Sequence, residues 1–362
     1  GNRVVRADDG NAKNFLCTYH GWTFGNDGRL EYVPGEQEAY YGALNKEELG
    51  LVEARVDAYA GIIFACWDKK APTLEAYIGD ARWYLDTLFN RRDNGMIAYG
   101  PQKWMEPVNW KTPVDNCSDN YHVPISHHSS TVVRNKFLGA QLTTMAGQLK
   151  HPNQNHHVFV NGHSITFRVN ETDEPRPNRV NKHNREYMER YHRESMPEVE
   201  RRLGHYRAHR IMLSNHSIFP HGVLGFRLAL PRGPLMTEFW HFEVFEKDIA
   251  EEVRHVMLRY GGGNNGASGL NEQDDIDNWR SVTEASKIPI AWRKYPALVN
   301  MGAGHAGPHD IWPGEVSDRY ISENNQRHFY KRWQEFMNAD SWADIGIEPI
   351  TAKYEGDAGM GR

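Results

Sequence analysis

Cysteine and long apolar runs are both scarce in this sequence. Three cysteines among 362 residues, Cys17, Cys66 and Cys117, are too few and odd in number for a disulfide framework. Such a count fits a reducing cytoplasm, where a special cysteine is more often a metal ligand than half of a disulfide. The longest apolar run, Ala60 to Trp67, is far too short to span a bilayer. With no secretory leader visible at Gly1, the sequence predicts a soluble, cytoplasmic protein.

An excess of one charge is also lacking. The 42 Lys and Arg residues nearly balance 47 Asp and Glu residues, which leaves a net charge of −5, and no basic stripe stands out. This balance argues against nucleic acid as the main partner. No internal repeat or low-complexity segment is visible either. A length of 362 residues with 39% apolar residues predicts about two domains with a large interior.

The pattern of apolar residues predicts an α+β fold with a domain boundary near residue 72. Residues 1–36 and 48–68 contain short strands and tight turns, and Lys69 to Pro72 is typical of a linker. From Thr73 to residue 89, apolar residues recur at helical spacing. We therefore expect an N-terminal domain over 1–72 and a second domain over 73–362. Later strands are expected at 100–110, 157–160, 165–168, 210–228 and 237–245, and helices at 184–203, 249–260 and 324–338.

Two conspicuous stretches are not interpreted as sites. The glycine-rich residues 261–269 lack the Lys-Ser/Thr of a phosphate-binding P-loop and follow a helix, so a flexible loop is expected. Four histidines with irregular spacing surround a predicted hairpin turn at Asn161 and Gly162. We interpret them as solvated strand residues rather than metal ligands. They are His151, His156, His157 and His163.

The segment Asp115 to His127 gathers two imidazoles, two carboxylates and a thiol into thirteen residues. His122 and His127, with a carboxylate from elsewhere in the chain, would form the two-His, one-carboxylate set that holds iron with open positions for oxygen. Five residues rotate an ideal helix by about 140°, so the two rings can meet only at a π-bulge or at a bend at Pro124. Ordinary polar residues on a helix face are the alternative interpretation.

Two further segments carry metal-binding residue types. Cys17 and His20 lie three residues apart in the glycine-containing segment Cys17 to Trp22, where they can ligate a metal cluster together. A packed cysteine beside a surface histidine is the alternative, and a c-type haem motif would need a second cysteine before the histidine.

The late acidic segment Leu270 to Trp279 offers carboxylates. A solvated helix N-terminus would have the same composition, because carboxylates favour the helix dipole there.

The segment Cys17 to Trp22 resembles the second half of a Rieske [2Fe–2S] motif, whose first half is a Cys-x-His further upstream. In such a centre two cysteines hold one iron and two histidines hold the other. The opening Gly1 to Val5 is similar to the segment that follows the first half. The resemblance therefore implies that this chain begins inside the motif and carries half of the cluster ligands, Cys17 and His20.

Two later segments match the same family in the same order. Asp119-x-x-His122-x-x-x-x-His127 and the acidic Glu272 to Asp275 resemble motifs of Rieske non-haem iron ring-hydroxylating oxygenase α (large) subunits, of the naphthalene, biphenyl and toluene dioxygenase type. The resemblance covers nearly the whole chain. It implies a mononuclear non-haem Fe(II) ion held by His122, His127 and Asp275.

The resemblance also implies a fold and a role for Asp119. The implied fold is a partial all-β Rieske domain over 1–72 and a catalytic domain over 73–362, with an antiparallel sheet flanked by helices of the helix-grip (START-like) type. Asp119 would be catalytic, because its carboxylate would join His122 to a His20 from an adjacent chain. Asp274 is the less favoured choice of iron-binding carboxylate.

The implied activity is that of a terminal oxygenase that uses O2 for cis-dihydroxylation of an aromatic hydrocarbon, including polycyclic ones. Electrons would come from NADH through a reductase and a ferredoxin. The implied assembly is a homotrimer or an α3β3 complex with a small β subunit. Three alternatives stay open: a Rieske-type monooxygenase or demethylase, a hydrolytic zinc enzyme built on the same three ligands, and an inactive fragment that retains the iron-binding fold.

Residues that line the substrate cavity over the iron are implied by the same resemblance. The stretch before Asp119 looks one residue shorter than in the naphthalene and biphenyl enzymes, so the pocket amide is either Asn116 or is replaced by Asp115. Apolar members of the set indicate an apolar, aromatic-shaped substrate. The implied lining residues are Asn116, Cys117, Val123, Leu213, Asn215, Leu270 and Asn271.

Overall fold

The structure is a computed structural model that describes residues 2–7, 10–138, 155–173, 183–223, 226–294, 298–317, 319 and 321–355. The chain forms two compact units, residues 1–74 and residues 75–362. All three cysteines are described and are free. No helix in the described ranges is long and apolar enough to cross a membrane. The cytoplasmic location stays a prediction.

The first unit is built from short antiparallel strands. One three-stranded sheet has the order β1-β2-β3, and β4 and β5 form a hairpin. Its small core consists of Phe24, Leu30 and Val33. Because β1 and β2 pair directly, the segment between them must turn tightly, and this turn contains Cys17 and His20. The elements are β1 (Asn14–Leu16), β2 (Thr23–Gly25), β3 (Leu30–Tyr32), α1 (Glu36–Tyr40), η1 (Lys46–Glu48), β4 (Arg55–Tyr59) and β5 (Ile62–Cys66).

The second unit is organised around one large antiparallel sheet, which confirms the α+β prediction. In the described residues its nine strands have the order β13-β14-β7-β8-β9-β10-β11-β12-β6. The β7–β8 hairpin turns at Asn161 and Gly162, whose φ angles of 51° and 87° fit the turn predicted there. The strands are β6 (Met96–Glu106), β7 (Asn155–Val160), β8 (His163–Val169), β9 (Ile211–Ile218), β10 (Gly222–Val223), β11 (Phe226–Pro231), β12 (Thr237–Glu246), β13 (Gly307–Pro308) and β14 (Glu315–Ser317).

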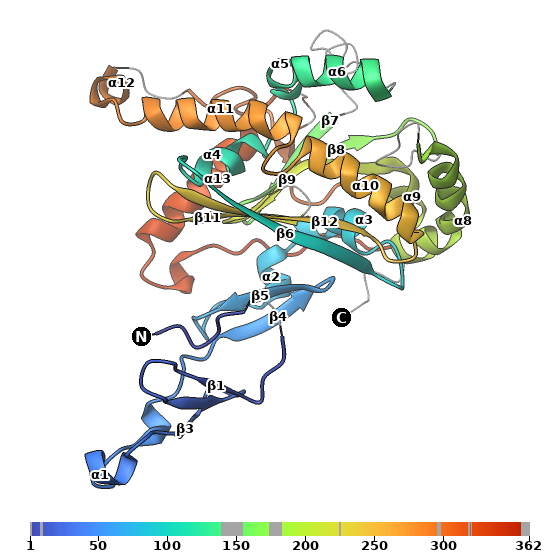
Figure 1. Cartoon of the computed structure of the whole chain (residues 1–362). Helices are drawn as coiled ribbons and strands as arrows, with labels where there is room; N and C mark the ends of the chain where they lie inside the picture. The colour runs from blue at the N-terminus through green and yellow to red at the C-terminus, as the bar shows by residue number, and fades with distance from the viewer. Residues whose placement is uncertain are drawn as a thin grey trace. The chain divides into compact units, whose positions relative to one another are not determined.

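Helices cover this sheet. In Figure 1, α10 lies over the β12 and β6 end of the sheet beside α11, while α3 packs on β8 and β9 and α13 packs on β7 and β8. The helices are α2 (Leu74–Ile78), α3 (Ala81–Phe89), α4 (Lys111–Asn116), α5 (Val123–Ser126), α6 (His128–Leu138), α8 (Arg185–Leu203), α9 (His205–Arg210), α10 (Glu251–Asn264), α11 (Leu270–Ala285), α12 (Pro289–Lys294), α13 (Asn324–Asn338) and η3 (Trp342–Asp344).

The glycine-rich stretch is only partly a loop, so the prediction of a flexible loop over 261–269 was wrong for its first residues. Helix α10 continues through three glycines to Asn264. A Cβ atom on Gly261 would lie 2.2 Å from Oε1 of Glu243 on β12. The lack of a Cβ atom at Gly261 therefore leaves room for the Glu243 carboxylate beside the helix backbone.

The histidines around the β7–β8 hairpin are buried, so their interpretation as solvated residues was wrong. His156, His157 and His163 are each less than 5% exposed, because β7 and β8 are interior strands covered on both faces. His163 donates from Nε2 to the Tyr77 carbonyl at 2.8 Å and accepts the Phe219 N–H at Nδ1. Burial lowers the pKa of His163 to about 4, so this ring is neutral. His151 lies outside the described residues.

Candidate metal centre

The two histidines of the motif flank a very short helix. His122 precedes α5 and His127 follows it, with Pro124 in the first turn, where proline is tolerated. The backbone of His127 (φ −98°, ψ 22°) ends α5, and α6 begins at the next residue. This break, rather than a π-bulge, brings the two rings together, with centroids 5.5 Å apart and planes at 72°.

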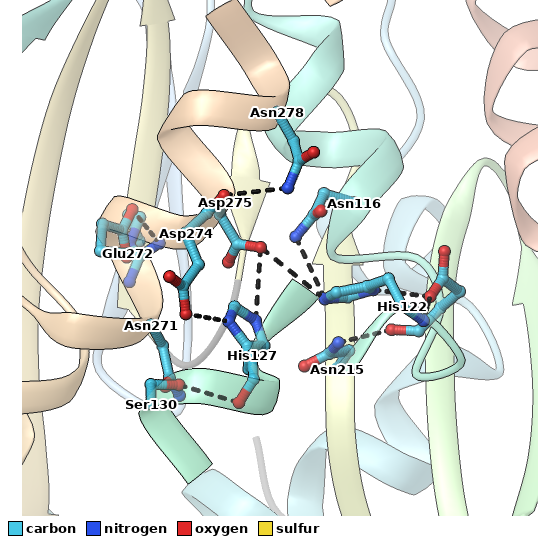
Figure 2. Close-up of polar contacts among 12 residues, drawn as sticks. Asn116, His122, His127, Ser130, Asn215, Asn271, Glu272, Asp274, Asp275 and Asn278 are labelled. Carbon is cyan, nitrogen blue, oxygen red and sulfur yellow. Dashed lines mark hydrogen bonds and ion pairs between the residues drawn. The ribbon is translucent and has the colours of Figure 1, made fainter. Parts of the chain in front are cut away.

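Asp275 joins the two rings from the first turns of α11. Its Oδ1 atom lies 3.3 Å from His127 Nε2 and 3.9 Å from His122 Nε2. Figure 2 shows both imidazoles directed toward this carboxylate. The three potential ligand atoms lie within 4.8 Å of one another. Asp275 Oδ1 is buried and accepts no hydrogen bond, which is costly for a carboxylate unless a cation is bound beside it.

The outer nitrogens of both rings are held by carboxylates. His122 Nδ1 donates to Asp119 Oδ1 at 2.7 Å, and His127 Nδ1 donates to Asp274 Oδ2 at 3.3 Å. These partners place the ring proton on Nδ1 and turn the Nε2 lone pair of each imidazole toward Asp275. Asp274 therefore holds His127 at Nδ1, the nitrogen that points away from the centre, while Asp275 faces the Nε2 atoms of both rings (Figure 2).

The electrostatics of the centre favour a positive charge. Burial disfavours protonation of His127, but the nearby carboxylates of Asp275 and Asp274 outweigh this effect and raise the pKa of His127 above its ordinary value. Two imidazoles and one carboxylate, with both outer nitrogens anchored, are the donor set of a facial triad for Fe(II). The residues present therefore fit a mononuclear iron ion.

Asp119 is itself held by a residue that the sequence did not indicate. Gln326, in the first turn of α13, donates from Nε2 to Asp119 Oδ2 at 2.8 Å. The neighbouring Asn325 donates to the Ser118 carbonyl at 3.0 Å. Both amides are almost fully buried, and both lie 207 residues from their partners along the chain. The only signal for these residues in the sequence is the run of amide side chains at the start of a helix that is rich in aromatic residues.

A buried ion pair anchors α11 behind the centre. Arg227 on β11 donates from Nη1 to Glu272 Oε1 at 2.8 Å, and both side chains are almost fully buried. Burial raises the pKa of Glu272, an effect that the Arg227 charge opposes. Glu272 lies one helical turn before Asp275, so the pair fixes the turn from which Asp275 projects. The acidic motif in the sequence indicates Glu272, whereas no motif indicates Arg227.

Three of the expected lining residues lie at the centre. Asn116 Nδ2 lies 3.4 Å from His122 Nε2. Asn215, on β9, donates to the Asp119 carbonyl. Asn271 accepts a hydrogen bond from Ser130 at 2.9 Å (Figure 2). Their contact with substrate stays a prediction.

The other four expected lining residues are more dispersed. Cys117 is 1% exposed and packs in a hydrophobic cluster with Val114, Phe219, Val223 and Phe329. Val123 is half-buried, and Leu270, the first residue of α11, is 46% exposed. Leu213 lines a cavity of about 310 Å³ bounded by β9, β12, α3, α8 and α10. Methionines from several elements line it as well: Met96, Met188, Met196, Met212 and Met257.

Asp115 is a second carboxyl group close to the centre. Its Oδ2 atom accepts a hydrogen bond from the Tyr330 hydroxyl at 2.8 Å. Burial raises the pKa of Asp115 to about 6; the Tyr330 hydrogen bond opposes this, and the charges of Asp119 and Glu323 add to it. Because the native state keeps a proton on Asp115 that the unfolded chain releases, the contribution of Asp115 to stability falls as the pH rises from about 4 to about 6.

We expect Asp115→Asn to be more stable than the wild type by about 3 kcal/mol at about pH 8. The amide has no charge to bury and keeps an acceptor for Tyr330. The advantage should shrink as the pH falls through 6 toward about 4, where wild-type Asp115 is protonated in both states. Thermal unfolding at several pH values measures this, with the exposed Asp277→Asn as control. An Asp115→Asn advantage that does not depend on pH would contradict the assignment.

The first unit presents Cys17 and His20 on one tight turn. The Cys17 carbonyl accepts from Gly21 N–H at 2.8 Å, and Cys17 N–H donates to the Trp22 carbonyl at 2.7 Å. Hydrogen bonds from the backbone N–H groups of Tyr19 and His20 hold the pKa of the Cys17 thiol below its ordinary value, which favours the metal-binding thiolate. The His20 side chain is exposed. In the described part of the chain, no third Cys, His, Asp or Glu completes a group with these two.

Comparisons with protein families, with individual sequences and with solved structures all match this chain to ring-hydroxylating dioxygenases. Residues 74–339 match a family described as ring hydroxylating alpha subunit (catalytic domain). The chain is 34% identical to biphenyl 2,3-dioxygenase subunit alpha of Rhodococcus jostii (strain RHA1), with 95% of this chain and 75% of that protein aligned. It is 33% identical to benzene 1,2-dioxygenase subunit alpha of Pseudomonas putida, over 94% and 76%. The structure of naphthalene 1,2-dioxygenase with indole in its active site superimposes with a TM-score of 0.83 at 29% identity, covering 94% of this chain and 77% of that one.

Proposed function

This chain belongs to the ring-hydroxylating α-subunit family of oxidoreductases, as its motifs indicated, and on that premise we propose that it is a terminal oxygenase for cis-dihydroxylation of an aromatic hydrocarbon. The arrangement of His122, His127 and Asp275 is the observation that supports this proposal best. Fe(II) held by these residues would supply one-electron chemistry and open positions for dioxygen. The relatives in this family are dioxygenases, so hydrolysis at a zinc ion is not supported as the activity.

The surrounding residues of the chain have positioning roles in this proposal. Asp119 and Asp274 fix the tautomer and the orientation of the two imidazoles, and Gln326 holds Asp119 in turn. The Arg227–Glu272 pair keeps α11 in place. Together these contacts hold the three ligand side chains in one arrangement, as a precise metal site requires.

We propose an apolar aromatic substrate for this site. The relatives named above act on biphenyl and benzene, and the compared structure is of a naphthalene dioxygenase. Leu213, which lines the cavity of about 310 Å³ described above, is one of the proposed lining residues. Asn116, Cys117, Val123, Asn215, Leu270 and Asn271 are the other proposed lining residues.

We further propose that residues 1–72 belong to a Rieske domain that delivers electrons. Cys17 and His20 would supply one cysteine and one histidine to a [2Fe–2S] cluster, which takes two of each. The proposed donors are a ferredoxin and an NADH-dependent reductase, and the proposed assembly is a homotrimer or an α3β3 complex with a β subunit. The lowered pKa of the Cys17 thiol supports its role as a thiolate ligand.

Isotope labelling tests the proposed reaction. With a ferredoxin, a reductase and NADH, the protein is expected to convert naphthalene, biphenyl or benzene into a diol that carries both atoms of one ¹⁸O2 molecule. A monooxygenase would place one ¹⁸O atom in the product, and a hydrolase would place none. Turnover that continues without O2 would reject the oxygenase proposal altogether.

A further inference from the structure

A second group of metal-ligating side chains lies at the junction of α8 and α9, apart from His122, His127 and Asp275. Glu200 is in the last turn of α8, and His205 and His209 are one helical turn apart on α9. Glu200 Oε1 lies 3.0 Å from His205 Nδ1, and Oε2 lies 3.2 Å from His209 Nε2. The two rings have centroids 4.6 Å apart, and the three potential ligand atoms lie within 4.8 Å of one another.

The outer nitrogens of these two rings are anchored by a single residue, Asp173. His205 Nε2 lies 3.2 Å from Asp173 Oδ2, and His209 Nδ1 lies 3.1 Å from the Asp173 main-chain carbonyl. Arg210 Nε in turn lies 3.1 Å from Asp173 Oδ1. A carbonyl oxygen can only accept, so His209 carries a proton on Nδ1, and its Nε2 atom faces Glu200.

This arrangement has the pattern seen at the first centre. There too, each imidazole gives its outer N–H to an oxygen acceptor and points its other nitrogen at a shared carboxylate. An imidazole lone pair and a carboxylate oxygen repel one another at about 3 Å unless a proton or a metal ion lies between them. One metal ion satisfies both lone pairs and the carboxylate together, whereas protons would have to charge both rings.

We propose that Glu200, His205 and His209 bind a divalent transition-metal ion of the Zn²⁺ class, with Asp173 as the residue that orients both imidazoles. Two imidazoles and one carboxylate favour Zn²⁺ over the oxygen-preferring Mg²⁺ and Ca²⁺. Glu200 and Asp173 carry two negative charges against the single positive charge of Arg210, so a cation is electrostatically favoured. The His205 side chain is 56% exposed, which leaves the ion a route from solvent and a position for water.

The site has a structural consequence for the cavity. His209 and its neighbour Ala208 line the cavity that Leu213 and Met196 also line. An ion bound by Glu200 on α8 and by two residues of α9 would hold the two helices, and therefore this wall of the cavity, in one arrangement. Metal binding is expected to raise the thermal unfolding temperature of the protein.

Zn²⁺ titration of the metal-free full chain tests the site in the Asp275→Ala background, which removes the first centre. That variant is expected to bind one equivalent of Zn²⁺, and Co²⁺ in its place should give the visible absorption of a four-coordinate ion. Adding His205→Gln and His209→Gln together should remove this equivalent. Glu200→Gln, which removes only the charge, should weaken it, and Asp173→Ala should weaken it about 10- to 100-fold.

His255→Gln is the matched control in the same background. His255 lies on α10 one turn from Glu251, at 3.9 Å, and forms no group of three potential ligands within the described residues. This variant should keep the Zn²⁺ equivalent. The proposal is overturned if Asp275→Ala takes up no Zn²⁺. It is also overturned if the paired His205 and His209 substitutions leave the Zn²⁺ uptake unchanged, because the ion would then be bound elsewhere, for example at Cys17 and His20. Neither result depends on ring hydroxylation, so the proposed function is tested separately.

Discussion

Asp275→Ala is expected to lose its iron and to show no ring hydroxylation above background. Asp275 Oδ1 faces the Nε2 atoms of both His127 and His122 and has no hydrogen-bond donor of its own. Removing an outer hydrogen-bond partner of a metal site typically costs about 10- to 100-fold, and loss of a direct ligand should cost more than about 100-fold. Iron content by elemental analysis and the rate of diol formation measure the two effects.

Two other aspartates of α11 make matched controls for this variant. Asp277 is exposed, so Asp277→Ala should keep both iron and activity. Asp274 holds His127 Nδ1 from outside, so Asp274→Ala should lower iron affinity or turnover by about 10- to 100-fold without abolishing either. If Asp275→Ala kept its iron while Asp274→Ala lost it, the assignment of ligand and support would be reversed.

Asp119→Ala is expected to keep iron bound and to lose turnover. The three ligand side chains remain in this variant, so iron is retained. The 2.7 Å hydrogen bond that fixes the tautomer and orientation of His122 is lost, and Gln326 loses its acceptor. We further expect electron transfer to the iron to stop, because the resemblance gives this carboxylate the link to a cluster histidine. Iron content, turnover, and product formed per O2 consumed are the measurements.

Gln326→Leu separates the positioning of Asp119 from its direct role. This substitution leaves the His122–Asp119 hydrogen bond in place and removes only the donor to Oδ2, so a smaller loss of turnover is expected. The substitution also leaves the main-chain contact between Asn215 and Asp119 intact. Normal turnover with normal coupling in Asp119→Ala would refute the role of this carboxylate.

The elements that were predicted well depend on short stretches of sequence. The Asn161–Gly162 turn is set by two residues with positive φ, and α8 by an amphipathic pattern over one segment. The residue types at His122 and His127 indicated a metal centre, although their five-residue spacing would separate the two rings on a continuous helix. The break at His127 that resolves this difficulty is a local backbone change with no signature in residue spacing.

The wrong predictions concern residues whose surroundings come from distant strands. Polar and small residues indicate solvent or loop when they are considered alone. His157 is nevertheless buried, because β7 lies inside a sheet of nine described strands. Helix α10 extends through Gly261, whose lack of a Cβ atom leaves room for the Glu243 side chain of β12. In both cases the neighbours that decide the outcome are far away in the sequence.

The sequence by itself determined the family, the α+β class and the three side chains that meet at the candidate iron centre, since ordered motifs and periodicity are properties of the chain alone. Only the tertiary structure decided which groups support them. Gln326 reaches Asp119 across 207 residues, Arg227 reaches Glu272 between a strand and a helix, and Glu200 meets two histidines at a helix junction. Hydrogen bonds and ion pairs act over a few ångströms of space, and residue spacing does not encode that distance once the chain has folded back on itself.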